Sequence, residues 1–246
     1  MYAGFVPRLC LLRLEGYLTF SSTAAPVIVG RDLTVTEYRP APVIHNITLT
    51  YALAGLPHGS LGSRVNPPPW RARPEPPQYV VASELRRRLY VYPAKPVRVV
   101  LEKQLAIAGG ERLVSLQAQF KSMYPWRVLH QYYAPGSEFL TAVLAAPGWR
   151  PPRVVRLGAK RYGVARVECR EAEVSPAGPG FSDPVNLGDI ESWGLEPRRV
   201  IVLLDHKNPT AGRIVRAELD SLYEVRARLG GHTYTMLLPL PPGAGP

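Results

Sequence analysis

Apolar and polar residues alternate over several short runs of this chain, and this period of two limits the fold more than any other feature of the sequence. Alternation sends successive side chains to opposite sides of an extended backbone, so each run predicts a β-strand with one buried face. Residues 112–122 (RLVSLQAQFKS) are the cleanest example, with four apolar side chains expected on one face: Val114, Leu116, Ala118 and Phe120. Residues 164–171 (VARVECRE) and 212–222 (GRIVRAELDSL) follow the same pattern.

Four other segments predict extended chain. Residues 8–15 would form a strand with Cys10, Leu12 and Leu14 on one face. The apolar runs are residues 138–146 (EFLTAVLAA) and 198–204 (RRVIVLL), and the second of them is expected to be buried. The remaining segment, residues 86–102, is broken at Pro93 and Pro96.

One short helix is expected after His45, with Asn46 as its N-cap and with Ile47, Tyr51 and Ala54 along one stripe beside Leu53. Residues 57–79 form a long excursion rich in Pro and Gly, which inside a folded domain is either functional or disordered. The sequence therefore predicts an α+β fold that is rich in strands, has few helices and carries long Pro- and Gly-rich loops. No repeat or domain boundary is visible. We expect a single domain over residues 1–238 with an inserted loop at about 58–78, and a disordered tail over 239–246.

The positive charge of the chain is concentrated in one region. The 246 residues carry a net charge of +11, yet the part from Asp183 to Pro246 has a net charge of −1. Residues 150–170 alone hold seven cations and one acidic residue. A basic patch of this kind favours an acidic partner, nucleic acid first and an anionic membrane second.

Arginine supplies 25 of the 30 cations. Its planar guanidinium binds phosphate through two parallel hydrogen bonds and stacks on bases. A GC-rich genome or a hot habitat would produce the same bias, and the 27 prolines fit a thermophile as well.

Several classes of protein are not supported by the sequence. Two cysteines, Cys10 and Cys169, predict neither a disulfide framework nor a cysteine zinc site. No long uncharged apolar segment or signal peptide is found, so a cytoplasmic protein without membrane contact is expected. The five histidines have no metal-ligand spacing, and P-loop, GxSxG and HExxH motifs are absent. We therefore expect no metal, no cofactor and no enzymatic activity.

The loop inside residues 154–168 (VVRLGAKRYGVARVE) is the strongest candidate for a binding site. Arg156, Lys160 and Arg161 can neutralise phosphates, and Tyr162 can stack on an unpaired base. Its two glycines, Gly158 and Gly163, would let the backbone approach a ligand closely. Arg150 and Arg153 are expected on the same surface. The alternative is a solvated hairpin tip.

His45 is the only histidine in a suggestive position, beside Asn46 at the start of the expected helix. It could act as a general base on a ribose hydroxyl. It could instead order the entry to the helix, which is the commoner role for a polar residue there. The helix N-terminus could also accept a phosphate without any catalysis.

Six segments occur in an order that resembles one protein family: PVIHNITLTYALAGL, LYVYPAKP, QFKS, YYAPGSEFLTAVLA, VVRLGAKRYGVARVE and DPVNLGDI. The chain is similar, from about Leu9 to Leu219, to the Cas-five-type (Csc-one) subunit of type I-D CRISPR interference complexes. The ordered set carries the resemblance, above all the segments IHNxxLTYAL and RLGAKR.

The resemblance implies a RAMP fold, which is a ferredoxin-like RRM core with long insertions, and a role in antiviral defence. Such a subunit holds the 5′ handle of the crRNA, caps the Cas-seven-type backbone and contacts the large subunit near the PAM of target DNA. It is expected to be non-catalytic, because a separate Cas-six-type RNase cuts the precursor. The residues expected at RNA are Arg156, Lys160 and Arg161 in one segment and His45, Asn46 and Tyr51 in another.

The chain departs from the family pattern in DPVNLGDI, where HPVNPLD is expected, and this puts a role for that loop in doubt. Two alternatives remain. A related subunit that cleaves precursor crRNA would use His45, Tyr51 and Lys121, and Lys121 is also expected to contact RNA. The second alternative is a basic ribonucleoprotein scaffold outside CRISPR.

The Pro-rich excursion contains an aromatic residue among cations: Arg64, Trp70, Arg71 and Arg73. Such a loop suits a nucleic-acid groove or a partner surface. We expect it to reach the backbone subunit or the target duplex.

Overall fold

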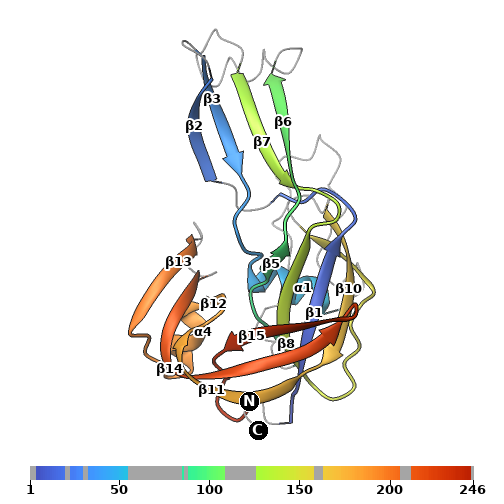
Figure 1. The fold of residues 1–246 in the computed structure, drawn as a ribbon, viewed down its shortest axis with the longest axis vertical. Helices are drawn as coiled ribbons and strands as arrows, with labels where there is room; N and C mark the ends of the chain where they lie inside the picture. The colour runs from blue at the N-terminus through green and yellow to red at the C-terminus, as the bar shows by residue number, and fades with distance from the viewer. Residues whose placement is uncertain are drawn as a thin grey trace, which may run out of the picture.

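The computed structural model describes residues 4–19, 23–29, 33–54, 85, 88–108, 126–157, 163–205 and 212–244. These residues form three β-sheets and two short helices, α1 (Asn46–Leu53) and α4 (Leu187–Ser192). Antiparallel pairing dominates, and β3 with β7 is the parallel pair. The expectation of a strand-rich fold with few helices is confirmed. In Figure 1 two sheets form the body, and the third extends away from it as an arm.

The main sheet is built around β1. Its strands, in spatial order, are β4 (Leu89–Val91), β8 (Glu138–Ala145), β1 (Val6–Leu14), β10 (Gly163–Glu171) and β9 (Val154–Leu157), and β5 (Lys95–Arg98) pairs with the other end of β8. The strand predicted over residues 8–15 is confirmed, and so is the prediction that Cys10, Leu12 and Leu14 share one of its faces. Cys10, Leu12 and Leu14 belong to the core cluster that includes residues of α1, whereas Leu9 and Leu11 point into a second core. Both faces of β1 are buried because another layer covers each of them.

Cys10 and Cys169 form a disulfide, which the sequence did not lead us to expect. The two residues lie directly opposite each other in the antiparallel pair of β1 and β10, with their Cα atoms 4.1 Å apart. They are 159 residues apart in the sequence, so only the register of the two strands brings them together.

Helix α1 begins one residue earlier than expected. His45 is the N-cap, with its Nδ1 atom accepting a hydrogen bond from the backbone N–H of Ile47 at 3.2 Å. Asn46 is the first residue of the helix, and its side chain is buried. The buried face of the helix is also different from the stripe that periodicity suggested, and consists of Asn46, Leu49, Thr50 and Leu53.

The second sheet curls around one long strand. The long strand is β14 (Arg213–Leu229). The other four strands all pair with it: β11 (Glu173–Phe181), β12 (Val185–Asn186), β13 (Arg199–Asp205) and β15 (His232–Leu238). One end of β14 pairs with β12 and β13, and its other end pairs with β15 across the bottom of the body (Figure 1). The apolar side chains of this sheet form the core between the two sheets, together with Leu9 and Leu11 of β1 and with Leu140, Ala142 and Leu144 of β8.

The strand predicted over residues 198–204 is present as β13, but it is not buried. Val200, Ile201 and Val202 have 43%, 48% and 51% of their surface exposed. An unbroken apolar run usually indicates a strand covered on both faces. Among the described residues β13 pairs with β14 alone, and the side chains at its centre are exposed on both faces.

The arm is a four-stranded sheet that connects to the body near α1. Its strands, in spatial order, are β2 (Thr23–Val29), β3 (Leu33–Arg39), β7 (Trp126–Tyr133) and β6 (Leu101–Ala108). Tyr133 fixes the base of the arm, since its hydroxyl donates to the carbonyl of Ala41 at 3.0 Å and its ring packs edge-on against Phe139. Burial raises the pKa of Tyr133 to about 12.

Other expectations have mixed outcomes. Pro93 separates β4 from β5 as expected. Pro96 lies within β5, which in the described part of the chain pairs with β8 on one side only. At the start of the tail, Leu240 is buried and the carbonyl of Pro239 accepts a hydrogen bond from the hydroxyl of Tyr92. The strand expected over 112–122 and the loop at 58–78 lie outside the described residues.

Candidate nucleic-acid interface

The edge of the main sheet formed by β9 and β10 carries the basic segment that the sequence singled out. In β9, Val155 and Leu157 are buried on the side of α1, so Arg156 projects from the opposite face and is exposed. Arg156 lies opposite Val164 of β10. Arg153 precedes β9 and is held beside β10 by a hydrogen bond of 2.9 Å from the N–H of Val167 to its carbonyl. This edge is therefore a rigid support for exposed arginines.

The arginines around this edge fall into two groups. Three of them have acidic partners: Arg13 with Glu138, Arg166 with Glu15, and Arg170 with Glu168. Arg150, Arg153 and Arg156 are exposed, and no ion pair is found for them within the part of the chain that the structure covers. A cation without an acidic partner keeps its full attraction for an anion, and phosphate is the anion that guanidinium groups bind best. We call Arg150, Arg153 and Arg156 the open arginines.

The tip of this hairpin, with Lys160, Arg161 and Tyr162, lies outside the described residues. Gly163, where β10 begins, has an internal role. A Cβ atom at this position would lie 2.7 Å from Cδ1 of Leu18 and 3.1 Å from the carbonyl oxygen of Leu157. The packing of the chain against itself therefore requires glycine at this position.

His45 and Asn46 are buried, with 5% and 1% of their surface exposed. The ring of His45 caps α1, which matches the structural alternative for this residue and leaves its Nδ1 lone pair engaged. Neither side chain offers the surface that contact with RNA requires. Tyr51, on the same helix, is partly exposed. The remaining candidates, Arg64, Trp70, Arg71, Arg73 and Lys121, are outside the described residues.

Asn46 belongs to a buried polar network that the sequence did not reveal. Its Nδ2 atom donates to Oδ2 of Asp189 at 3.0 Å, and its Oδ1 atom accepts from Nδ2 of Asn186 at 3.1 Å. The hydroxyl of Tyr90 also donates to Oδ2 of Asp189, at 2.8 Å. Asn186 caps α4 through the N–H of Gly188. Three segments that are far apart in the sequence are joined here, because buried polar groups must find partners.

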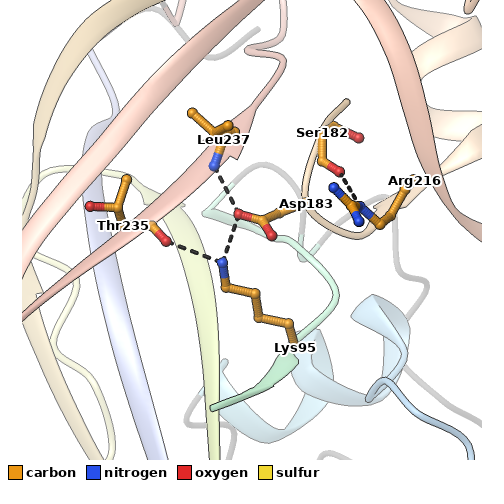
Figure 2. Close-up of polar contacts among 6 residues, drawn as sticks. All are labelled: Lys95, Ser182, Asp183, Arg216, Thr235 and Leu237. Carbon is orange, nitrogen blue, oxygen red and sulfur yellow. Dashed lines mark hydrogen bonds and ion pairs between the residues drawn. The ribbon is translucent and has the colours of Figure 1, made fainter. Parts of the chain in front are cut away.

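A second contact pins the loop that precedes β12. The ammonium group of Lys95 donates to Oδ2 of Asp183 at 2.8 Å and to the carbonyl of Thr235 at 3.1 Å (Figure 2). The same carboxylate oxygen accepts from the N–H of Leu237 at 2.9 Å. Asp183 stands where the resemblance led us to expect His, and this ion pair gives the loop a structural role. Beside it, the guanidinium of Arg216 donates to the carbonyl of Ser182 (Figure 2).

The charges at the base of the arm are also paired internally. Glu37 has 2% of its surface exposed. It accepts a hydrogen bond from Arg39 and forms an ion pair with Lys103, and both contacts lower the pKa of its carboxyl group. The described residues contain no group of three or more potential metal ligands and no helix long and apolar enough to cross a membrane. The open arginines are thus the clearest functional feature of the described surface.

Comparison with known proteins points in the same direction as the sequence. A family model described as "Type I-D CRISPR-associated protein Cas5/Csc1" matches residues 8–202. No curated protein matches the chain. A solved structure titled "Crystal structure of a CRISPR protein from Archaeoglobus fulgidus" is 11% identical to it, with a TM-score of 0.35, and the alignment covers 95% of this chain and 100% of that one.

Proposed function

Because the chain belongs to the Cas5/Csc1 family of type I-D CRISPR-associated proteins, we propose that it is a non-catalytic, crRNA-binding subunit of a type I-D interference complex. It holds the 5′ handle of the crRNA, caps the Cas-seven-type backbone and contacts the large subunit near the PAM of target DNA, as part of antiviral defence. The ferredoxin-like RRM core that the resemblance implied is part of the same proposal. Because the chain belongs to this family, we do not favour the alternative of a ribonucleoprotein scaffold outside CRISPR.

The observation that carries the proposal is the set of open arginines on the β9–β10 edge. Each can displace a counterion from one phosphate, and three on one rigid edge can follow the backbone of a single strand. Lys160, Arg161 and Tyr162 follow directly in the sequence and would extend this surface with two cations and a stacking ring. The acidic partners of Arg13, Arg166 and Arg170 make those three residues weaker candidates for phosphate contacts.

The proposal of a non-catalytic role is supported by the state of His45. A general base needs an accessible lone pair within hydrogen-bond reach of the hydroxyl that it deprotonates. His45 is buried, and its Nδ1 atom is engaged by the backbone of α1. Purified protein should therefore leave repeat RNA intact, with or without divalent metal. Stoichiometric cleavage that His45→Ala abolishes would establish the nuclease alternative instead.

The test of the proposal uses the RNA that the protein carries. The chain is co-expressed with the other subunits and a CRISPR array, purified, and its bound RNA is sequenced. Fluorescence anisotropy then compares a crRNA with its 5′ handle intact and one of equal length whose handle is scrambled. We expect preferential binding of the intact handle. Equal affinity for the two RNAs would refute handle recognition, while leaving general RNA binding in place.

A further inference from the structure

Strand β13 exposes apolar side chains on both of its faces. Val200 and Val202 point to one side and Ile201 to the other, and between 43% and 51% of the surface of each is exposed. Three consecutive exposed β-branched residues on a strand are unusual for a surface that remains in water, and contiguous apolar patches of this kind mark sites of interaction.

The backbone of β13 is open along one edge. Its hydrogen bonds connect it to β14 over the range from Arg199 to Asp205, and within the described part of the chain no strand pairs with its other side. Proteins usually protect such an edge with a charge or a proline at its centre. Here the centre of the strand is apolar, so the edge is suited to accept another strand.

The charges around β13 argue against nucleic acid as the occupant. Arg199 pairs with Glu218, Arg198 with Asp220 at 2.5 Å, and Arg213 with Asp205 at 3.2 Å. These three cations and three acidic residues neutralise one another around the exposed valines. Arg216, which lies opposite Ile201 on β14, is held by the carbonyl of Ser182 and lies over the ring of Phe181. This arrangement is the opposite of the β9–β10 edge, where the open arginines have no acidic partner among the residues that the structure describes. A neutral apolar strip has no net charge to attract a polyanion, but it can pack against an uncharged segment of protein.

We propose that the free edge of β13 binds an extended segment of a partner protein, which adds to the curled sheet as a further strand. The segment carries apolar side chains at alternate positions, because only a strand added at the edge can cover Val200 and Val202 on one face and Ile201 on the other. The inference rests on the proposed function, since it takes the partner from the other subunits of the type I-D complex. It assigns to β13 a role in assembly that is separate from RNA binding.

The test combines one substitution with hydrogen exchange. Ile201→Lys places a charge at the centre of the edge, where the side chain is half exposed, so we expect the fold to tolerate it. Val99→Lys is the matched control, because Val99 has 47% of its surface exposed and lies between β5 and β6. Each variant is co-expressed with the tagged remaining subunits and crRNA, and its recovery with the tag is measured. Amide exchange of residues 199–205 is compared between the free and assembled parent.

We expect recovery of Ile201→Lys to fall at least tenfold, recovery of Val99→Lys to match the parent, and the amides of 199–205 to gain protection on assembly. Normal assembly of Ile201→Lys, or unchanged exchange, would overturn the inference. A concentration-dependent dimer of the free parent that Ile201→Lys abolishes would overturn it in favour of a second copy of the chain. Affinity of the isolated variants for crRNA separates the two proposals, since β13 can fail as an interface while RNA binding persists.

Discussion

Reduction of the disulfide between Cys10 and Cys169 should destabilise the protein strongly. The bond closes a loop with a sequence separation of 159 residues, so it removes a large amount of conformational entropy from the unfolded chain. The chain-entropy relation gives about 5 kcal/mol at 25 °C for a loop of this size. For a domain of this length such a loss lowers the melting temperature by about 10–20 °C. In urea, with a slope of about 2.5 kcal/mol per molar, it lowers the unfolding midpoint by about 2 M.

The assay is urea unfolding followed by tryptophan fluorescence, with and without reductant, on the parent and on the double variant Cys10→Ala/Cys169→Ala. The variant should unfold early under both conditions, because Cys10 is fully buried and its replacement also removes packing. The parent should move toward the variant only when it is reduced. Identical curves for the parent with and without reductant, together with two free thiols in the denatured unreduced protein, would refute the reasoning.

Two further predictions concern packing and pH. Gly212→Ala should destabilise the protein by about 2 kcal/mol or more, because Gly212 has a φ of +76° and a Cβ atom there would lie 2.3 Å from Oδ1 of Asn186. Gly148→Ala is the control, since its φ is +81° with no atom within 4 Å of the added Cβ, and urea unfolding should show a smaller loss for it. The raised pKa of Tyr133 predicts stability that is fully present below pH 10 and declines as the pH rises toward about 12, because the unfolded chain loses this proton first. Tyr133→Phe should flatten that decline in alkaline unfolding curves, and an equally steep decline in the variant would contradict the assignment.

The strands could be predicted from the sequence where the pattern is local. The alternation in residues 8–15 and 164–171 correctly gave the faces of β1 and β10, since a period of two depends only on the geometry of an extended backbone. The apolar run of β13 was misjudged for a tertiary reason. An apolar composition indicates that the side chains of a strand are more stable when buried. It does not indicate whether this chain or another protein buries them.

The roles of single residues depended on contacts between distant segments, which the sequence does not encode in its spacing. Asn46 has the side chain of an N-cap, yet the amide is used to join Asp189 and Asn186, and His45 takes the cap instead. The disulfide was missed because two cysteines 159 residues apart give no sign of strand register. The sequence located the basic segment, but the division between paired and open arginines required the positions of the acidic residues.

The central claim is that the open arginines bind the phosphates of crRNA, and the salt dependence of binding tests it most directly. The triple variant Arg150→Ala/Arg153→Ala/Arg156→Ala is compared with Arg198→Ala/Arg213→Ala/Arg226→Ala, which removes the same charge from residues that already have acidic partners. Loss of three contacts to a single strand should reduce the slope of log K against log salt by about 2. We expect that reduction, with weaker binding, in the first variant and little change in the second. Equal slopes and affinities in the first variant and the parent would contradict the account.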